Sequence, residues 1–271
     1  MYAASSREAL EGARVELEAA LRGLPSAEAV TIGDELLSFA QTVSDNRALR
    51  TALADSATPT AARADIARDL LAGKVSEVTR TTVASATARH WSRDTDLASA
   101  LQELGREAML ASAKSDGRLD TVEEELFLLG RTVKENTELE QALSDRTRPE
   151  ADRAALLGRL IDGKVDEVTR RLAVQAVVTS TEAPGDVIDE LSGLAAGANG
   201  RKVAYVTSAG ELSAAQRTDL ADKLSGIYGA QVTLHVEIDP ELLGGVVVRV
   251  GDERIDGSIA GKLAALRRGL R

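Results

Sequence analysis

The chain has only two histidines, a residue type that often acts as a general base or binds a metal, and it has no cysteine. His90 stands beside Trp91, and His235 falls on the polar face of a predicted strand. Neither has a second histidine at the spacing that zinc sites use. We therefore expect a structural role for each histidine, and we expect no metal site.

A glycine-rich segment near the carboxyl end, from Gly257 to Leu263, has some features of a phosphate-binding loop. It is one residue short between its glycines, and the leucine stands where a Ser or Thr would hold magnesium. The segment Gly197–Lys202 is also too short, and it precedes a strand rather than joining a strand to a helix. We therefore expect no nucleotide site and no cofactor.

Carboxylates are too numerous to be assigned a role from the sequence. With 43 acidic residues, many pairs must arise by chance, so none can be identified as a general acid or base. Because no phosphate loop, catalytic base or metal site can be identified, the sequence predicts a protein that is not an enzyme.

The charge distribution argues against nucleic acid as a partner. The formal net charge is −10 and aromatic residues make up 2% of the chain, whereas nucleic-acid binders show basic stripes, often with stacking aromatics. One basic cluster follows the last acid, Asp256, and consists of Lys262, Arg267, Arg268 and Arg271. These cations could simply stabilise a helix C-terminus, or they could form a docking edge for an acidic partner helix.

No part of the sequence is suited to direct membrane insertion. No run approaches the roughly 20 apolar residues that a spanning helix needs. The first residues have no basic region leading into an apolar core, so they do not predict a secretory signal. Any association with a membrane is expected to come through partners.

The elements that would position these residues are clearest near the carboxyl end. Apolar and polar residues alternate from Val232 to Ile238, which predicts a strand with one buried face. Asp239-Pro240 ends it, because proline lacks the ladder donor. The unbroken run Val246–Val250 predicts a central strand covered on both faces. A turn at Gly251-Asp252 would lead into a short return strand.

Three further features complete the carboxyl-terminal unit. A strand is predicted at Val203–Val206, followed by a helix that ends near Tyr228, and a last helix is predicted from Ser258 to Leu270. Gly244-Gly245 either supplies backbone freedom where a strand begins or forms a partner contact. The small residues from Ala195 to Gly200 predict a flexible linker before this unit.

An internal repeat determines the rest of the architecture. Residues 34–80 align without a gap onto residues 124–170, and 21 of the 47 pairs are identical. The offset of 90 residues is too long for a solenoid unit, so it indicates a duplicated domain. Helical spacing of apolar residues and short connections predict a bundle for each copy. Asp120 and Glu123 have the spacing of a capping box at a helix start.

The predicted fold is mainly α with a small α+β carboxyl-terminal domain: two tandem helical bundles followed by a mixed sheet with helices. We expect boundaries that give an extra bundle at 1–95, a second bundle at 96–198, and an α/β domain at 199–271.

The carboxyl-terminal pattern resembles the signature of the δ subunit family of bacterial F-type ATP synthase, whose mitochondrial counterpart is the oligomycin-sensitivity-conferring protein. Its spacing is carried by Ile238, Asp239, Leu242, Gly244, Gly245, Val246, Val248, Arg249, Gly251, Asp256, Gly257 and Ser258. The second bundle resembles the family's helical domain through Arg106–Ala111, Gly117–Leu119 and Val122–Leu126. Residues 1–95 then form an extra copy, as in some actinobacterial members.

This resemblance implies a non-catalytic stator subunit of the peripheral stalk. In the family, the helical domain binds the N-termini of α subunits at the top of the catalytic head, and the carboxyl-terminal domain binds the b subunits. Such a protein would lie at the cytoplasmic face of the cell membrane, as a peripheral part of the complex. A helical adaptor in an unrelated assembly and an enzyme with an unrecognised site are the alternatives.

Overall fold

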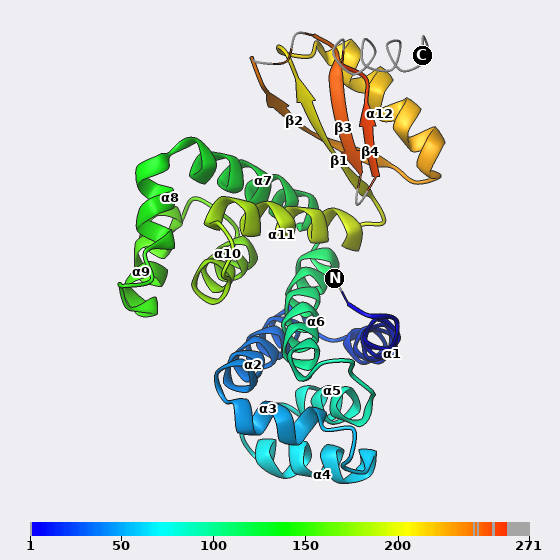
Figure 1. The fold of residues 1–271 in the computed structure, drawn as a ribbon, viewed down its shortest axis with the longest axis vertical. Coiled ribbons are helices and arrows are strands. Elements are labelled where there is room, and N and C mark those ends of the chain that lie inside the picture. Colours follow the sequence, from blue (N-terminus) through cyan, green and yellow to red (C-terminus); the bar gives the residue numbers. More distant parts are fainter. Residues whose placement is uncertain (1, 241, 243, 251–252, 259–271) are drawn as a thin grey trace, which may run out of the picture.

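A computed structural model describes residues 2–240, 242, 244–250 and 253–258. In this part of the chain, helices α1–α11 precede a four-stranded sheet that has one further helix, α12, on one side. Figure 1 shows the first helices at one end of an elongated molecule, α7–α11 in the middle, and the sheet at the other end. The predicted class, mainly α with a small α+β domain, is confirmed.

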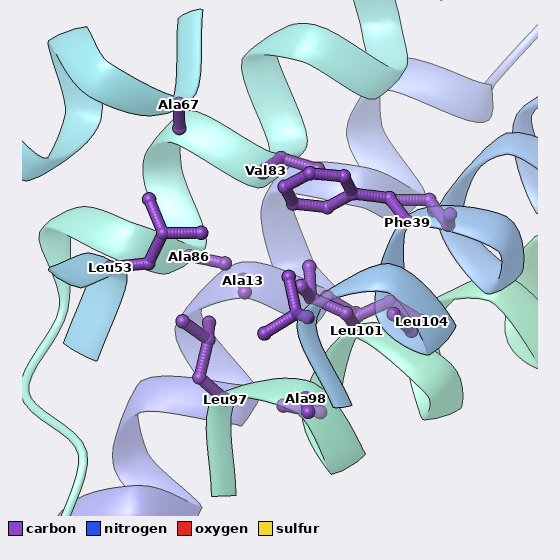
Figure 2. Packing of buried hydrophobic residues seen from close by; sticks show 14 of the residues in the cluster. Ala13, Phe39, Leu53, Ala67, Val83, Ala86, Leu97, Ala98, Leu101 and Leu104 are labelled. Carbon is purple, nitrogen blue, oxygen red and sulfur yellow. The ribbon is translucent and has the colours of Figure 1, made fainter. Parts of the chain in front are cut away.

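The first bundle surrounds a core of small and branched apolar side chains. Leu97 and Leu101 meet Phe39 and Leu53 there, and alanines such as Ala13 let the helices approach closely (Figure 2). The helices of this bundle are α1 (Ala4–Leu21), α2 (Ser26–Asp45), α3 (Arg47–Ala54), α4 (Thr60–Leu71), α5 (Glu77–Ala88) and α6 (Asp94–Ser115).

The second bundle repeats the first, as the sequence predicts. Its helices are α7 (Leu119–Glu135), α8 (Thr137–Ser144), α9 (Glu150–Ile161), α10 (Glu167–Thr179) and α11 (Pro184–Ala198). Both ends of α8 and α9 fall 90 residues after those of α3 and α4, the offset of the sequence repeat. The duplication is therefore structural as well as sequential.

The same polar contact anchors an equivalent helix in both copies. Glu35 on α2 accepts from the backbone N–H of Ser76 at 3.0 Å, and Glu125 on α7 accepts from that of Asp166 at 2.8 Å. Each carboxylate also accepts a hydrogen bond of 2.6 Å from a threonine hydroxyl, that of Thr79 in the first copy and that of Thr169 in the second. A glutamate from one helix thus satisfies free N–H groups at the start of another.

Helix α6 belongs to both bundles. Leu97, Leu101 and Leu104 in its first half lie in the first core, whereas Met109 and Leu110 lie in the second. The expected boundary between residues 95 and 96 falls in the first turn of this helix. The division into units at 1–95, 96–198 and 199–271 stays a prediction.

Helix α2 also packs on the second bundle. Its Leu37 lies in the second core, and Asp34 forms an ion pair with Arg171 of α10. Gly33 and Gly105 allow α2 and α6 to cross closely, since a Cβ at Gly33 would lie 2.9 Å from the Gly105 carbonyl oxygen. The two copies are consequently packed against each other rather than separated.

The sheet has the order β2-β1-β3-β4. Its strands are β1 (Lys202–Ser208), β2 (Val232–Ile238), β3 (Val246–Val250) and β4 (Glu253–Asp256), and α12 (Ala214–Tyr228) connects the parallel pair β1 and β2. The other two pairings are antiparallel. A left-handed Gly229 with φ 65° ends α12, where the sequence predicts a helix end.

Two expectations for this unit are wrong. Strand β3 is internal, as predicted, but it is not covered on both faces, because Arg249 is exposed and Val247 only half-buried. The predicted linker is largely helix: α11 continues to Ala198, and Ala195 and Ala196 are fully buried. These small residues serve close helix packing, so only three residues connect α11 to β1.

Two further predictions lie outside the described residues. The turn at Gly251-Asp252 is one of them, and all but the first residue of the helix expected from Ser258 to Leu270 is the other. The short return strand after that turn is confirmed as β4.

Candidate functional site

Several residues of the carboxyl-terminal signature lie in the connection that leads from β2 to β3. Ile238 ends β2, and the backbone N–H of Asp239 donates to the carbonyl of Ser208 on β1 at 2.8 Å. Leu242 donates to the carbonyl of Asp239 at 3.1 Å, which tightens the connection toward β3. The segment therefore fixes how the chain passes from β2, at the sheet edge, across β1 to β3.

The glycines of the signature bring two distant segments into contact. Gly245 has φ 83°, and a Cβ there would lie only 2.5 Å from the carbonyl oxygen of Gly257. The Gly257 N–H donates to the Val246 carbonyl at 2.9 Å. Asp256 then accepts from the hydroxyl of Ser258 at 2.6 Å, and this hydrogen bond lowers the pKa of the carboxyl. Gly245 therefore supplies the backbone freedom that is one of the two roles predicted for Gly244-Gly245.

The remaining signature residues divide between the faces and edges of the sheet. Val248 is buried in the small core under α12, whereas the Arg249 guanidinium lies 4.7 Å from the centre of the Tyr205 ring. Gly251 lies outside the described residues, as do Lys262, Arg267, Arg268 and Arg271 of the predicted basic edge.

The polar face of the sheet packs on the second bundle, which is the main difference from the sequence-based interpretation. His235 of β2 is 3% exposed and stacks on Phe127 of α7, with ring centres 3.9 Å apart. Tyr205 of β1 meets His235 edge-on and donates from its hydroxyl to the Asp189 carbonyl of α11 at 3.2 Å. Figure 1 shows the sheet above α7 and α11.

A charged cluster reinforces the same contact. Arg201, in the short connection before β1, donates to Glu123 of α7 at 2.6 Å and pairs with Asp120. The Glu123 side chain is 5% exposed, and burial raises the pKa of its carboxyl, while Arg201 opposes that rise. Asn199 donates to Asp120 at 2.6 Å. The connection is thus tied to α7 by several charge-assisted hydrogen bonds.

The expected capping box at Asp120 and Glu123 is wrong. Helix α7 begins at Leu119 without a side-chain cap, and both acids point to Arg201 instead. Sequence spacing gave no signal for this pairing, because the partners are about 80 residues apart along the chain. Phe127 and Tyr205 were missed for the same reason.

The polar groups of this site can hold two units together, and they do not form a recognisable reaction centre. His235 faces two aromatic rings and its Nδ1 has no partner among the described residues. His90 is exposed at the end of α5. Within the described ranges, no group of three His, Cys, Asp or Glu side chains is placed to hold a metal, and no helix is long and apolar enough to cross a membrane.

Acid should weaken the contact between the sheet and the second bundle. Burial lowers the pKa of His235 to about 4, below its ordinary value near 6.5. The unfolded chain therefore binds more protons between these values, and the folded state should lose up to about 3 kcal/mol of stability as the pH falls through this window.

Denaturant titrations between pH 7 and pH 4 would measure this loss. We expect His235→Phe to remove the corresponding part of the pH dependence, and His90→Phe, at the exposed histidine, is the matched control. Equal profiles for the wild type and His235→Phe would contradict the assignment.

Residues 106–270 match the family model "ATP synthase delta (OSCP) subunit". The matched range begins inside α6, at the point where the second core starts, and leaves out most of the first bundle.

Curated relatives match along the whole chain. "ATP synthase subunit delta" of Nocardia farcinica is 48% identical over 270 residues and covers all of both chains. The proteins of the same name from Rhodococcus opacus and Corynebacterium urealyticum are 48% and 45% identical, over 100% and 98% of this chain and 99% of each relative. A solved chain from the Toxoplasma gondii mitochondrial ATP synthase hexamer is 20% identical with a TM-score of 0.39, covering 61% of this chain and 94% of its own; this similarity is too low to support an argument.

Proposed function

The chain belongs to the ATP synthase delta (OSCP) subunit family, and we propose that it acts as a non-catalytic stator subunit of the peripheral stalk. Its bundles bind the N-termini of α subunits at the top of the catalytic head. Its carboxyl-terminal domain binds the b or b-like stalk subunit, so that rotor torque drives ATP synthesis. The observation that carries this proposal is the match along the entire chain to proteins named ATP synthase subunit delta.

The geometry suits a part that resists torque. The bundles share α6, and α2 of the first packs into the second. The sheet is fastened to α7 and α11 by stacked rings and by Arg201. A connector made of such contacts transmits force between two partners because its units cannot turn freely against each other. In the cell, we place the protein at the cytoplasmic face of the membrane, attached only through its partners.

Reconstitution tests this role. In this experiment, membranes are first stripped of both this protein and the catalytic head. When the head alone is returned, we expect it to bind, but its ATP hydrolysis should drive little proton pumping. We expect ATP-driven proton pumping to recover only when the chain is added as well, while ATP hydrolysis by the head requires no addition. Efficient pumping without the chain, or hydrolysis by the purified chain itself, would contradict the proposal.

The basic edge of Lys262, Arg267, Arg268 and Arg271 remains a proposed stalk contact. Exposed ion pairs contribute only ~0–1 kcal/mol each, so a single reversal should have little effect. Reversing Arg267 and Arg268 together to Glu should weaken stalk binding about tenfold at low salt and less at high salt, because salt screens exposed charges. Reversing Arg47 and Arg68 in the first bundle is the matched control. If the double reversal leaves the affinity for the stalk unchanged, the basic edge is not a stalk contact, and stabilisation of a helix C-terminus is the role that remains for it.

A further inference from the structure

A small cavity lies in the second bundle, where α8 and α10 end and α11 begins. Its volume is about 150 Å³, which is room for several water molecules or for one small oxyanion. Its wall includes Leu143 and Ser144 from the end of α8, Val177 from α10, and Ala183 and Pro184 at the start of α11. The cavity is thus bounded by three helix ends, where backbone polar groups have no partner within their own helix.

Arg153 of α9 lines this cavity and is buried without a carboxylate. The residue is 5% exposed. It donates from Nη1 to the carbonyls of Leu143 and Val177, at 3.4 and 3.2 Å, and from Nη2 to that of Val178 at 3.3 Å. These carbonyls lie in the last turns of α8 and α10. The guanidinium therefore caps two helix ends, and no carboxylate of the described residues lies within ion-pair distance of it.

The capping contacts leave part of this guanidinium free. An arginine side chain has five N–H donors, and the three carbonyls use three of them. The Nε of Arg153 has no partner among the described residues, so its N–H and one N–H of Nη2 are available. Two such donors match two oxygens of one oxyanion. Because a buried charge is costly without a counter-charge, an anion here would satisfy both the donors and the charge.

The lining of the cavity is positive, although the chain as a whole carries a formal charge of −10. Arg146 is exposed on the rim, where it donates to the carbonyl of Ser180 at 3.1 Å. Glu182 is an opposing acid, also exposed. Helix α11 begins at Pro184 without a side-chain cap, so the positive end of its dipole lies beside the cavity. Two arginines, one glutamate and an uncapped helix start together favour an anion.

The first bundle has the buried arginine but not the rest of this arrangement. Arg63, 90 residues before its counterpart, is 2% exposed and also has an Nε without a partner among the described residues. The position that corresponds to Arg146 is Ser56. Trp91, which is 4% exposed, lies three residues before α6, as Thr181 lies three residues before α11. A buried arginine therefore belongs to the repeated fold, whereas the second arginine beside it is particular to the second bundle.

We propose that this cavity is a binding site for a small tetrahedral oxyanion, of which inorganic phosphate is the simplest probe. The anion accepts from the free N–H groups of Arg153 and from Arg146, and it lies at the start of α11. Bound there, it ties the ends of α8 and α10 to α11, the helix whose Asp189 carbonyl accepts from Tyr205 of the sheet. Each chain binds one such anion.

Titration of the full chain with inorganic phosphate, by calorimetry at an ionic strength held constant with chloride, tests the proposal. We expect one saturable site, with a dissociation constant in the millimolar range or tighter, and a thermal midpoint that rises with phosphate. Arg146→Gln should weaken binding about tenfold, because it removes a cation from the rim. Glu182→Gln should tighten it about two- to threefold, because it removes the opposing acid. Arg148→Gln, at a 58% exposed side chain outside the cavity, is the matched control and should bind as the wild type does.

A variant of the buried arginine tests the donors themselves. Arg153→Lys keeps the charge but removes the Nε donor, and it should weaken binding about tenfold or more. Circular dichroism establishes whether this variant is folded; if it is not, the exposed Arg146→Gln decides. Sulfate, which has the same shape, should compete with phosphate. Absence of saturable binding, unchanged affinity in Arg146→Gln, or an equal loss in Arg148→Gln would overturn the proposal, since each shows general screening of charge rather than a site.

Discussion

Removal of residues 200–271 is expected to abolish binding to the b stalk while leaving binding to the catalytic head within about twofold of the full chain. The reason is that the bundles and the sheet have separate cores. The two bundle cores contain only residues before position 199, and the third lies wholly between β1, α12 and the other strands. The truncated chain should therefore keep its helices and its head-binding surfaces.

Calorimetry or pull-down of the truncated chain against the head and against the stalk would measure both affinities. Binding to the head, measured on the same preparation, is the control for folding, together with helix content by circular dichroism. Retained stalk affinity would refute the division of labour. Loss of both affinities from a folded chain would show that the sheet contributes to the head contact as well.

Arg201→Met is expected to destabilise the protein by about 3–5 kcal/mol at neutral pH, because it leaves a buried carboxylate without its cation. The carboxylate is that of Glu123, which is 5% exposed and 2.6 Å from the guanidinium. The effect should be concentrated at the contact between α7 and the sheet. Denaturant unfolding and limited proteolysis of the connection at residues 199–201 would detect it.

A second substitution distinguishes charge from packing. Glu123→Gln in the Arg201→Met background should restore most of the lost stability, since the neutral amide does not need a cation. Arg131→Met is the matched control, because that arginine pairs with Glu135 on the same helix but is 45% exposed, and we expect a change of about 0.5 kcal/mol or less. A single variant as stable as the wild type, or a double variant without recovery, would show that the cluster does not hold the domains together.

Local patterns in the sequence were sufficient to predict these helices and strands and the duplication of the bundle. Alternation from Val232 to Ile238 predicted β2, and the 90-residue repeat predicted that α8 and α9 would copy α3 and α4. The signature also determined the path between strands, since Gly245 has the positive φ and the close backbone approach that only glycine accommodates. These features depend on neighbouring residues or on a repeated sequence, so they can be recognised without coordinates.

Only the tertiary structure decided how those elements meet. An alternating strand shows that its faces differ, but not what covers the polar one, and here Phe127 of α7 buries His235. A stretch of small residues such as Ala195 and Ala196 is compatible with a flexible linker or with a tightly packed helix, and its neighbours in space determine which of these forms. Arg201 likewise meets Glu123 because folding brings together residues that are about 80 positions apart. Contacts at such separations have no local signature in the sequence, since they depend on the shapes and charges of two surfaces at once.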